Sequence, residues 1–397
     1  MLSVLRQACK SLVRRSFGPV AFAFAALALA ACQPVGGPSA GGPAIDSSAP
    51  VTVALLVPSG SGQASDELLA RSLQNAARLA LSDLGTSRID LRVYNTAGQP
   101  ATAQAMAIKA MDEGAKIILG PVFAQEANAV GVAAAARGVN VLAFSNNPDI
   151  AGGNVFILGP TFANTAARLS RYAVKNGKRR IMVVHDQNAA GTLGRAAIEQ
   201  GVSGAGGSVV AVGSYEFSQN GVVSAAPKIA AAAKANSADA LFLTADTAGA
   251  LPLISQLLAD SGMGPADTQF IGLTRWDIPQ ATLALPGVQG GWFAMPDPAL
   301  YQQYQSRYQT AFGETPHPIS GLAYDGIAAI GALLKQGKAN ALSGAALTQG
   351  AGFVGVNGIF RLRSDGLNER GLAVAQIRNR QVVIVDPAPR SFGGFGF

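Results

Sequence analysis

The sequence predicts an α/β protein with two lobes, each built on a parallel sheet flanked by helices. Short apolar runs, typical of strands buried on both faces, alternate with longer segments of helical periodicity. Two such series follow one another along the chain and meet at Gly159-Pro160. Because strand–helix–strand connections are right-handed and bring parallel strands together, each series predicts one open sheet with helices on its faces.

The first series starts with the apolar run at 51–57, which predicts a buried strand. The next segment predicts a helix, since Leu69, Leu73, Ala76 and Ala80 fall on one face. The same alternation continues with expected strands at 89–94, 116–119 and 139–144 and expected helices at 101–113 and 124–137.

The second series repeats this pattern after Gly159-Pro160. Its expected helices are at 164–176, 192–201, 222–235 and 248–261. Its expected strands are at 180–184, 208–215, 240–243 and 269–273. Two complete series of this length predict two lobes rather than one larger sheet.

The N-terminal residues 1–31 have the features of a secretory signal peptide. A basic segment without acidic residues precedes an apolar stretch at 17–31, which is too short for a typical membrane span. The sequence Leu-Ala-Ala-Cys at 29–32 resembles the bacterial lipobox, which implies that Cys32 is diacylated and becomes the mature N-terminus. Gln33 follows, without the Asp that indicates inner-membrane retention, so an outer-membrane anchor facing the periplasm is expected. The alternative is an ordinary signal peptide with an incidental cysteine.

Composition argues against cysteine chemistry and nucleic-acid binding. Residues 32–50 predict a lipidated cysteine and a flexible Gly/Pro/Ser-rich tether, and residues 387–397 predict a flexible tail. Cys9 is lost with the signal, so the domain between them has no thiol for a disulfide, a nucleophile or a metal site. The net charge of +7 includes four cations of the signal peptide and leaves +3, without the basic, aromatic-rich runs that bind nucleic acid.

Polar and small residues follow most of the expected strands. In open α/β sheets, ligands bind outside the carboxyl ends of the strands, so these residues are expected to line a crevice between the lobes. The alternative is that such residues end strands because they suit turns. The candidate ligand-binding residues are Ser59, Gly60, Ser145, Asn146, Asn147, Asp186, Asp246 and Trp276.

Gly120-Pro121, followed by the segment VLAFSNN at 141–147, resembles the type I periplasmic binding protein superfamily. The best-known members are the leucine/isoleucine/valine receptors of ABC transporters. The resemblance covers about 51–385 and implies a two-lobed leucine-binding-protein-like domain at 51–386 with three hinge crossings. It places lobe 1 at about 51–160 and 296–350, and lobe 2 at about 161–295 and 351–386.

Several short segments are similar to one branch, the penicillin-binding protein activator lipoproteins of the LpoA type. They are NVFILGP at 154–160, GVNG at 355–358 and RGLAVAQIRNRQVVIV at 370–385. This resemblance implies a non-catalytic periplasmic lipoprotein that stimulates a penicillin-binding protein, the peptidoglycan synthase, by direct contact.

The alternative is a substrate-binding protein that delivers an amino acid or a similar small polar solute to an ABC permease. Receptors of this kind hold the ligand ammonium with an acidic group and cover the ligand with an aromatic ring. Ala190 stands where that ring is expected, which favours the activator hypothesis. The tether and lipid suit both, because each keeps the protein near an envelope partner.

The sequence does not indicate an enzyme. The chain has only two histidines, and it contains no nucleophile elbow, zinc-binding helix motif or phosphate-binding glycine loop. His185 follows a buried strand without a second histidine or thiolate, so a structural role is expected rather than a metal site. No cofactor and no metal are therefore predicted.

Overall fold

The computed structural model describes residues 42–46, 48–85, 88–264 and 268–393. The predicted signal peptide at 1–31 and the predicted lipidation site Cys32 lie outside the described residues. Within the described residues, no helix is both long and apolar enough to cross a bilayer.

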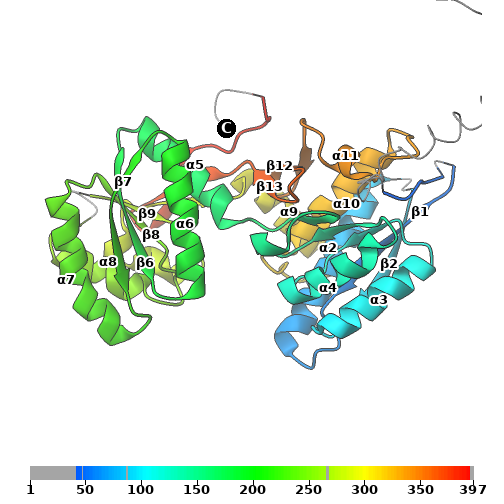
Figure 1. The fold of residues 1–397 in the computed structure, drawn as a ribbon, viewed down its shortest axis with the longest axis horizontal. Helices are drawn as coiled ribbons and strands as arrows, with labels where there is room; N and C mark the ends of the chain where they lie inside the picture. The colour runs from blue at the N-terminus through cyan, green and yellow to red at the C-terminus, as the bar shows by residue number, and fades with distance from the viewer. Residues whose placement is uncertain (1–41, 47, 86–87, 265–267, 394–397) are drawn as a thin grey trace, which may run out of the picture. The chain divides into compact units, whose positions relative to one another are not determined.

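Lobe 1 is built on a parallel sheet of order β2-β1-β3-β4-β5. The strands are β1 (Val51–Val57), β2 (Ile89–Asn95), β3 (Ile117–Leu119), β4 (Asn140–Ala143) and β5 (Val155–Ile157). Helices α2 (Ala64–Leu84) and α10 (Gly321–Leu334) cover one face, while α3 (Pro100–Asp112) and α4 (Ala124–Ala135) cover the other (Figure 1). Val53 and Leu55 pack against the first pair, and Ala54 and Leu56 against the second. Both faces of β1 are thus buried, as its apolar run predicts.

Lobe 2 is built on a seven-stranded sheet of order β15-β14-β10-β9-β8-β6-β7. The parallel strands are β6 (Arg180–Asp186), β7 (Ser208–Tyr215), β8 (Ala240–Leu243), β9 (Gln269–Gly272) and β10 (Trp292–Met295). Helices α5 (Phe162–Lys175) and α6 (Ala189–Gly204) cover one face, and α7 (Gln219–Ala235) and α8 (Leu251–Asp260) the other (Figure 1). The predicted parallel sheet is extended by two antiparallel strands, β14 (Ala373–Arg378) and β15 (Gln381–Asp386).

The segment between α10 and β14 belongs with lobe 1, which corrects the predicted lobe boundary at 350/351. It forms a small antiparallel sheet of β11 (Phe353–Gly355), β12 (Gly358–Leu362) and β13 (Asn368–Arg370). Phe353, Phe360 and Leu362 pack into the lobe 1 core, so burial ties this sheet to lobe 1. Among the described residues, the chain crosses between the lobes after β5, after β10 and after β13, and we call these the first, second and third crossings. It reaches lobe 2 for the last time at 371–372.

The remaining helices connect these elements. The longest, α9 (Pro298–Phe312), begins at Asp297, whose carboxylate accepts hydrogen bonds from two amides of the first turn, and it contributes buried Tyr304 and Tyr308 to the lobe 1 core. The others are the short helix α11 (Gly344–Leu347) and the 3-10 helices η1 (Pro148–Ile150), η2 (Gln280–Ala284) and η3 (Pro286–Val288).

Both terminal segments are packed over more of their length than the sequence predicts. Ile45, inside the predicted tether, is buried in the lobe 1 core, and its amide donates to the Ala339 oxygen at 2.9 Å. In the predicted tail, the guanidinium of Arg361 lies 4.7 Å from the centre of the Phe392 ring. Ile45 thus packs against apolar residues and Phe392 against a cation, and composition alone does not predict either contact.

A buried ion pair lies where the first and third crossings between the lobes come together. The side chains of Arg370 and Asp325 are 3% and 0% exposed, and their Nη1 and Oδ2 atoms are 3.3 Å apart. The same carboxylate accepts from the Val356 amide at 2.8 Å and the Asn357 side chain at 3.0 Å. Arg370 Nε donates to the Leu158 oxygen at 2.9 Å. One cluster therefore joins α10, the β11–β12 turn and the first and third crossings.

We predict that Arg370→Met destabilises the domain by about 3–5 kcal/mol, because it leaves the Asp325 carboxylate buried without its counter-charge. Urea unfolding followed by circular dichroism measures this loss. The control is Arg137→Met, which removes the exposed pair with Asp112 and should cost less than about 1 kcal/mol. Equal effects of the two substitutions would contradict a central role for the buried pair.

Candidate functional site

Lobe 2 has a small pocket at the carboxyl ends of its strands, with a volume of about 80 Å³. We call it the acidic pocket, because two carboxylates line it. The residues that follow or end β6, β7 and β8 provide most of its polar groups, as expected at the edge where ligands bind in such sheets. These groups are Asp186, Tyr215, Thr244 and Asp246.

Asp186 is buried and holds its surroundings in place. Thr244 Oγ1 donates to its Oδ1 at 2.6 Å, and the Asn188 side chain donates to its Oδ2. Asn188 in turn caps α6 by accepting from the Gly191 amide at 2.7 Å. Gly191 is required there, since a Cβ would lie 2.1 Å from the Asp186 backbone oxygen. The carboxylate thus positions the turn that begins α6.

Asp246 is exposed and is the carboxylate that a bound solute can reach. Its Oδ1 accepts from the Gly249 amide at 2.5 Å, which fixes the side chain at the pocket rim. Burial, together with the negative charges of Asp186 and Asp246, raises the pKa of Tyr215. The Tyr215 hydroxyl is buried and has no hydrogen-bond partner among the described residues. The pocket therefore has a negative potential and a free hydroxyl, a combination that suits a cationic group.

A larger cavity of about 240 Å³ lies beside the acidic pocket. We call it the apolar pocket, because aliphatic and aromatic side chains make up most of its lining. It lies where β9 and β10 end and shares Phe162 and Thr274 with the acidic pocket. Two cations also line it, and both are paired: the Arg275 Nε atom donates to Asp277 at 2.8 Å, and Arg370 pairs with Asp325. Its apolar lining residues include Phe162, Leu273, Ile278, Met295, Ile319 and Leu322.

The predicted residues of lobe 1 line neither pocket. Ser59 Oγ and the Gly60 amide each donate to the Glu67 carboxylate at 2.6 Å. Ser145 accepts from the Asn147 amide at 3.1 Å. These groups stabilise the turns that follow their strands, which is the alternative role expected for turn-forming residues.

Two further lobe 1 candidates follow the same pattern. The Asn147 side chain accepts from the Asp149 amide at 2.9 Å and begins η1. Asn146 is exposed beside it. The structure therefore brings Asp186 and Asp246 together in lobe 2 but does not join them to the lobe 1 candidates in one pocket.

The prediction for Trp276 is wrong, because the side chain is fully buried and packs in the lobe 2 core rather than facing a crevice. Gly272 and Gly291 make room for the indole, since a Cβ at either position would lie 2.3 Å from the ring. A tryptophan after a strand end gives no sequence signal that separates these two roles. Ala190, in contrast, does line the acidic pocket, so a small residue stands there.

The predicted site residues do not include Tyr215, Thr244 or Phe162. Tyr215 is the last residue of β7, and its place at a strand end was a usable signal. Phe162 is the first residue of α5 and reaches the pockets only because the first crossing lies beside β9 and β10. Among the described residues, no group of three or more histidine, cysteine or acidic side chains could hold a metal ion.

Two α/β lobes joined by three crossings, with pockets at the strand ends of lobe 2, are the architecture typical of two-lobed solute-binding proteins. The family model described as periplasmic binding protein matches residues 50–381. The chain belongs to the periplasmic binding protein family. No curated protein matches the chain.

Solved structures share the fold at low sequence identity. A protein assigned to branched-chain amino acid ABC transport in Rhodospirillum rubrum is 17% identical, with a TM-score of 0.72 over 84% of this chain and 99% of that one. A branched-chain amino acid ABC transporter periplasmic ligand-binding protein from Burkholderia xenovorans is 18% identical, with a TM-score of 0.66 over 87% and 97%. An ABC transporter substrate-binding protein from Desulfitobacterium hafniense, in complex with Leu, is 16% identical, with a TM-score of 0.62 over 84% and 99%.

These comparisons confirm the predicted family and fold. They favour the alternative function, a transport receptor, over the predicted penicillin-binding protein activator. The predicted closeness to the activator branch has no support among them.

One buried acid lies near the strand ends of lobe 1. Glu126, in the first turn of α4, is fully buried, and burial raises the pKa of its carboxyl group. The Thr96 hydroxyl and the Phe123 backbone oppose this rise in pKa more weakly. Burial favours the neutral acid in the folded state, whereas the unfolded chain releases its proton near the ordinary pKa of 4.5.

We predict that Glu126 makes the domain less stable as pH rises above about 4.5 and through the folded-state pKa, because only the unfolded chain ionises freely in that window. Urea midpoints at pH 5 and pH 8 measure the change. Glu126→Gln should lose less stability over this range than the wild type. Glu216→Gln removes an exposed carboxyl group and serves as the control. An identical pH dependence of Glu126→Gln and wild type would contradict the prediction.

Proposed function

We propose that this protein is the substrate-binding protein of an ABC transporter and that it takes a small solute with an ammonium group and an apolar body. The observation that carries the proposal is the shared border of the two pockets. The acidic pocket offers the Asp246 carboxylate and the free Tyr215 hydroxyl, and the apolar pocket begins at Phe162 and Thr274.

The two pockets divide the recognition of such a solute. A desolvated ammonium group needs an opposite charge or hydrogen-bond acceptors, which Asp246 supplies. An apolar body of a few carbon atoms gains from removing its surface from water, at about 25 cal/mol per Å². Apolar amino acids are one class that combines both features, and the solved neighbours include a receptor in complex with Leu.

The family supports a periplasmic location, and the transport neighbours support an ABC permease as the partner. A solute held at the strand ends contacts residues of the first crossing, since Phe162 begins α5 directly after it. Binding at this position can therefore affect the conformation of the segments that join the lobes.

We predict that Asp246→Asn weakens binding of a ligand amine by about tenfold or more, because it removes the accessible negative charge. A thermal-shift screen of the purified domain against amino acids with apolar side chains and the corresponding amines gives the ligand, and calorimetry gives its affinity. The matched control is Asp260→Asn, at the exposed end of α8.

The outcome for the control should be an unchanged affinity. A ligand whose affinity is equally insensitive to both substitutions would remove Asp246 from the site. Stabilisation by anionic solutes but by no amine or amino acid would overturn the proposed solute class.

We also propose that Cys32 carries the lipid that anchors the protein in the envelope, at the outer membrane. Support comes from the lipobox-like sequence at 29–32 and from Gln33 in the following position. The Gly/Pro/Ser-rich residues that follow give the domain reach from the membrane.

We predict that Cys32→Ala moves the protein from the membrane fraction to the soluble periplasmic fraction, because two acyl chains are needed for stable anchoring. Fractionation of cells that express the full chain, with intact-mass measurement of the mature protein, checks this. Cys9→Ala is the control and should leave the distribution unchanged. Membrane association of Cys32→Ala equal to wild type would contradict the proposed anchor.

A further inference from the structure

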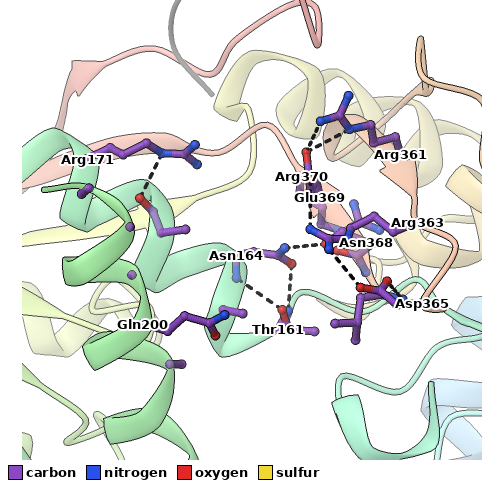
Figure 2. A pocket seen from close by; sticks show the side chains of 17 residues that line it. Thr161, Asn164, Arg171, Gln200, Arg361, Arg363, Asp365, Asn368, Glu369 and Arg370 are labelled. Carbon is purple, nitrogen blue, oxygen red and sulfur yellow. Dashed lines mark hydrogen bonds and ion pairs between the residues drawn. The ribbon is translucent and has the colours of Figure 1, made fainter. Parts of the chain in front are cut away.

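A third cavity adjoins the apolar pocket, with which it shares Thr161 and Arg370, and has no lining residue in common with the acidic pocket. Its volume is about 580 Å³, and one wall comes from α5 and α6 while the other comes from the β12–β13 hairpin (Figure 2). We call it the arginine pocket. Arg171 and Gln200 stand on the first wall, and Arg361 and Arg363 stand on the second (Figure 2).

The arginine pocket and the acidic pocket use opposite ends of α6. The acidic pocket is lined by Ala190 and Gly191 of its first turn, and the arginine pocket by residues from Ala197 to Ala205. Gly191 and Gly201 are ten residues apart, which is about 15 Å along a helix. A molecule in the arginine pocket therefore lies at a different place from a solute in the acidic pocket.

The arginine side chains of this pocket differ in how their charge is balanced. Arg361 and Arg363 pair with Glu369, and Arg363 also pairs with Asp365. Arg171 forms no ion pair within the described part of the chain, and its Nε donates to the Ala167 oxygen at 3.1 Å. Its remaining guanidinium donors are left for a molecule in the cavity.

The surroundings of Arg171 disfavour the charged form of its side chain. It is half-buried, and burial together with the nearby positive charge of Arg168 lowers its pKa, while Glu369 opposes that effect more weakly. Arg168 is itself neutralised by Asp386, with 2.8 Å between Nη2 and Oδ2. An anion beside Arg171 would supply the missing counter-charge.

The room in the pocket comes from small residues on the helix wall. These are Ala163, Ala167, Ala197, Gly201, Gly204 and Ala205. Gly201 also lets α5 and α6 pack closely, since a Cβ there would lie 2.9 Å from the Ala166 oxygen. The Gln200 side chain adds an amide donor on the same wall as Arg171 (Figure 2). The wall thus offers donors and space without a carboxylate.

We propose that the arginine pocket is a second binding site, one that takes a small anion with carboxylate or phosphate groups through Arg171 and Gln200. The fork of guanidinium donors matches the geometry of both groups. The volume of the cavity exceeds that of an inorganic ion, so a small organic anion can fill it. The proposed anion site is independent of the solute class, because neither Arg171 nor Gln200 lines either of the other two pockets.

The test is calorimetric titration of the full domain with citrate and, separately, with inorganic phosphate, at constant ionic strength set with NaCl. We expect saturable binding of at least one probe below about 10 mM. Tighter binding of citrate identifies a carboxylate ligand, and tighter binding of phosphate identifies a phosphate ligand. Arg171→Gln should weaken binding by about tenfold or more.

Lys175→Gln is the matched control, because it removes a positive charge one turn further along α5 and does not line the pocket. It should leave the affinity unchanged. Gln200→Glu places a carboxylate on the wall in nearly the same shape and should abolish binding, and it keeps the test valid if Arg171→Gln fails to fold. Asp246→Asn should have no effect, which separates this site from the proposed solute site.

Absence of saturable binding by wild type, or equal binding by wild type and Gln200→Glu, would overturn the proposal. A loss of affinity in Asp246→Asn that matches the loss in Arg171→Gln would also overturn it, because the anion would then lie in the solute site.

Discussion

The arrangement of the crossings depends on one buried ion pair, Arg370 with Asp325. Asp325 lies in the first half of α10, in lobe 1, and Arg370 ends the strand that precedes the last crossing. Two charges without solvent need every remaining donor and acceptor satisfied, and here backbone and amide groups do so at Val356, Asn357 and Leu158. The directional geometry of this cluster orients the chain as it leaves lobe 1.

Asn368 strengthens the same connection. Its side-chain nitrogen donates to the Ile157 and Gly159 oxygens at 2.7 and 2.9 Å, and its own backbone oxygen accepts from Asn164 at 2.8 Å. The first and third crossings are therefore joined by side-chain hydrogen bonds to backbone. Both the apolar pocket and the arginine pocket include Arg370 and Thr161, so the segments that join the lobes also shape both cavities.

The two lobes use their strand ends differently. In lobe 1, Ser59, Gly60, Ser145 and Asn147 bond to nearby groups of their own loops. In lobe 2, Asp186 accepts hydrogen bonds from Asn188 in its own loop and from Thr244 after β8, whereas Asp246 is exposed. The two ends of α6 also border pockets of opposite charge, the acidic pocket at its first turn and the arginine pocket at its last turns. This separation supports different ligand classes at the two places.

The sequence by itself determined the α/β class, the alternation of buried strands and helices, and the two lobes, because periodicity and burial of β1 are properties of neighbouring residues. It also predicted Asp186 and Asp246 at strand ends, and both line the acidic pocket. Only the tertiary structure decided that β11–β13 belong with lobe 1, that Trp276 is core, and that Phe162, Arg171 and Gln200 line cavities. These outcomes depend on contacts between residues far apart in the chain, which local pattern does not encode.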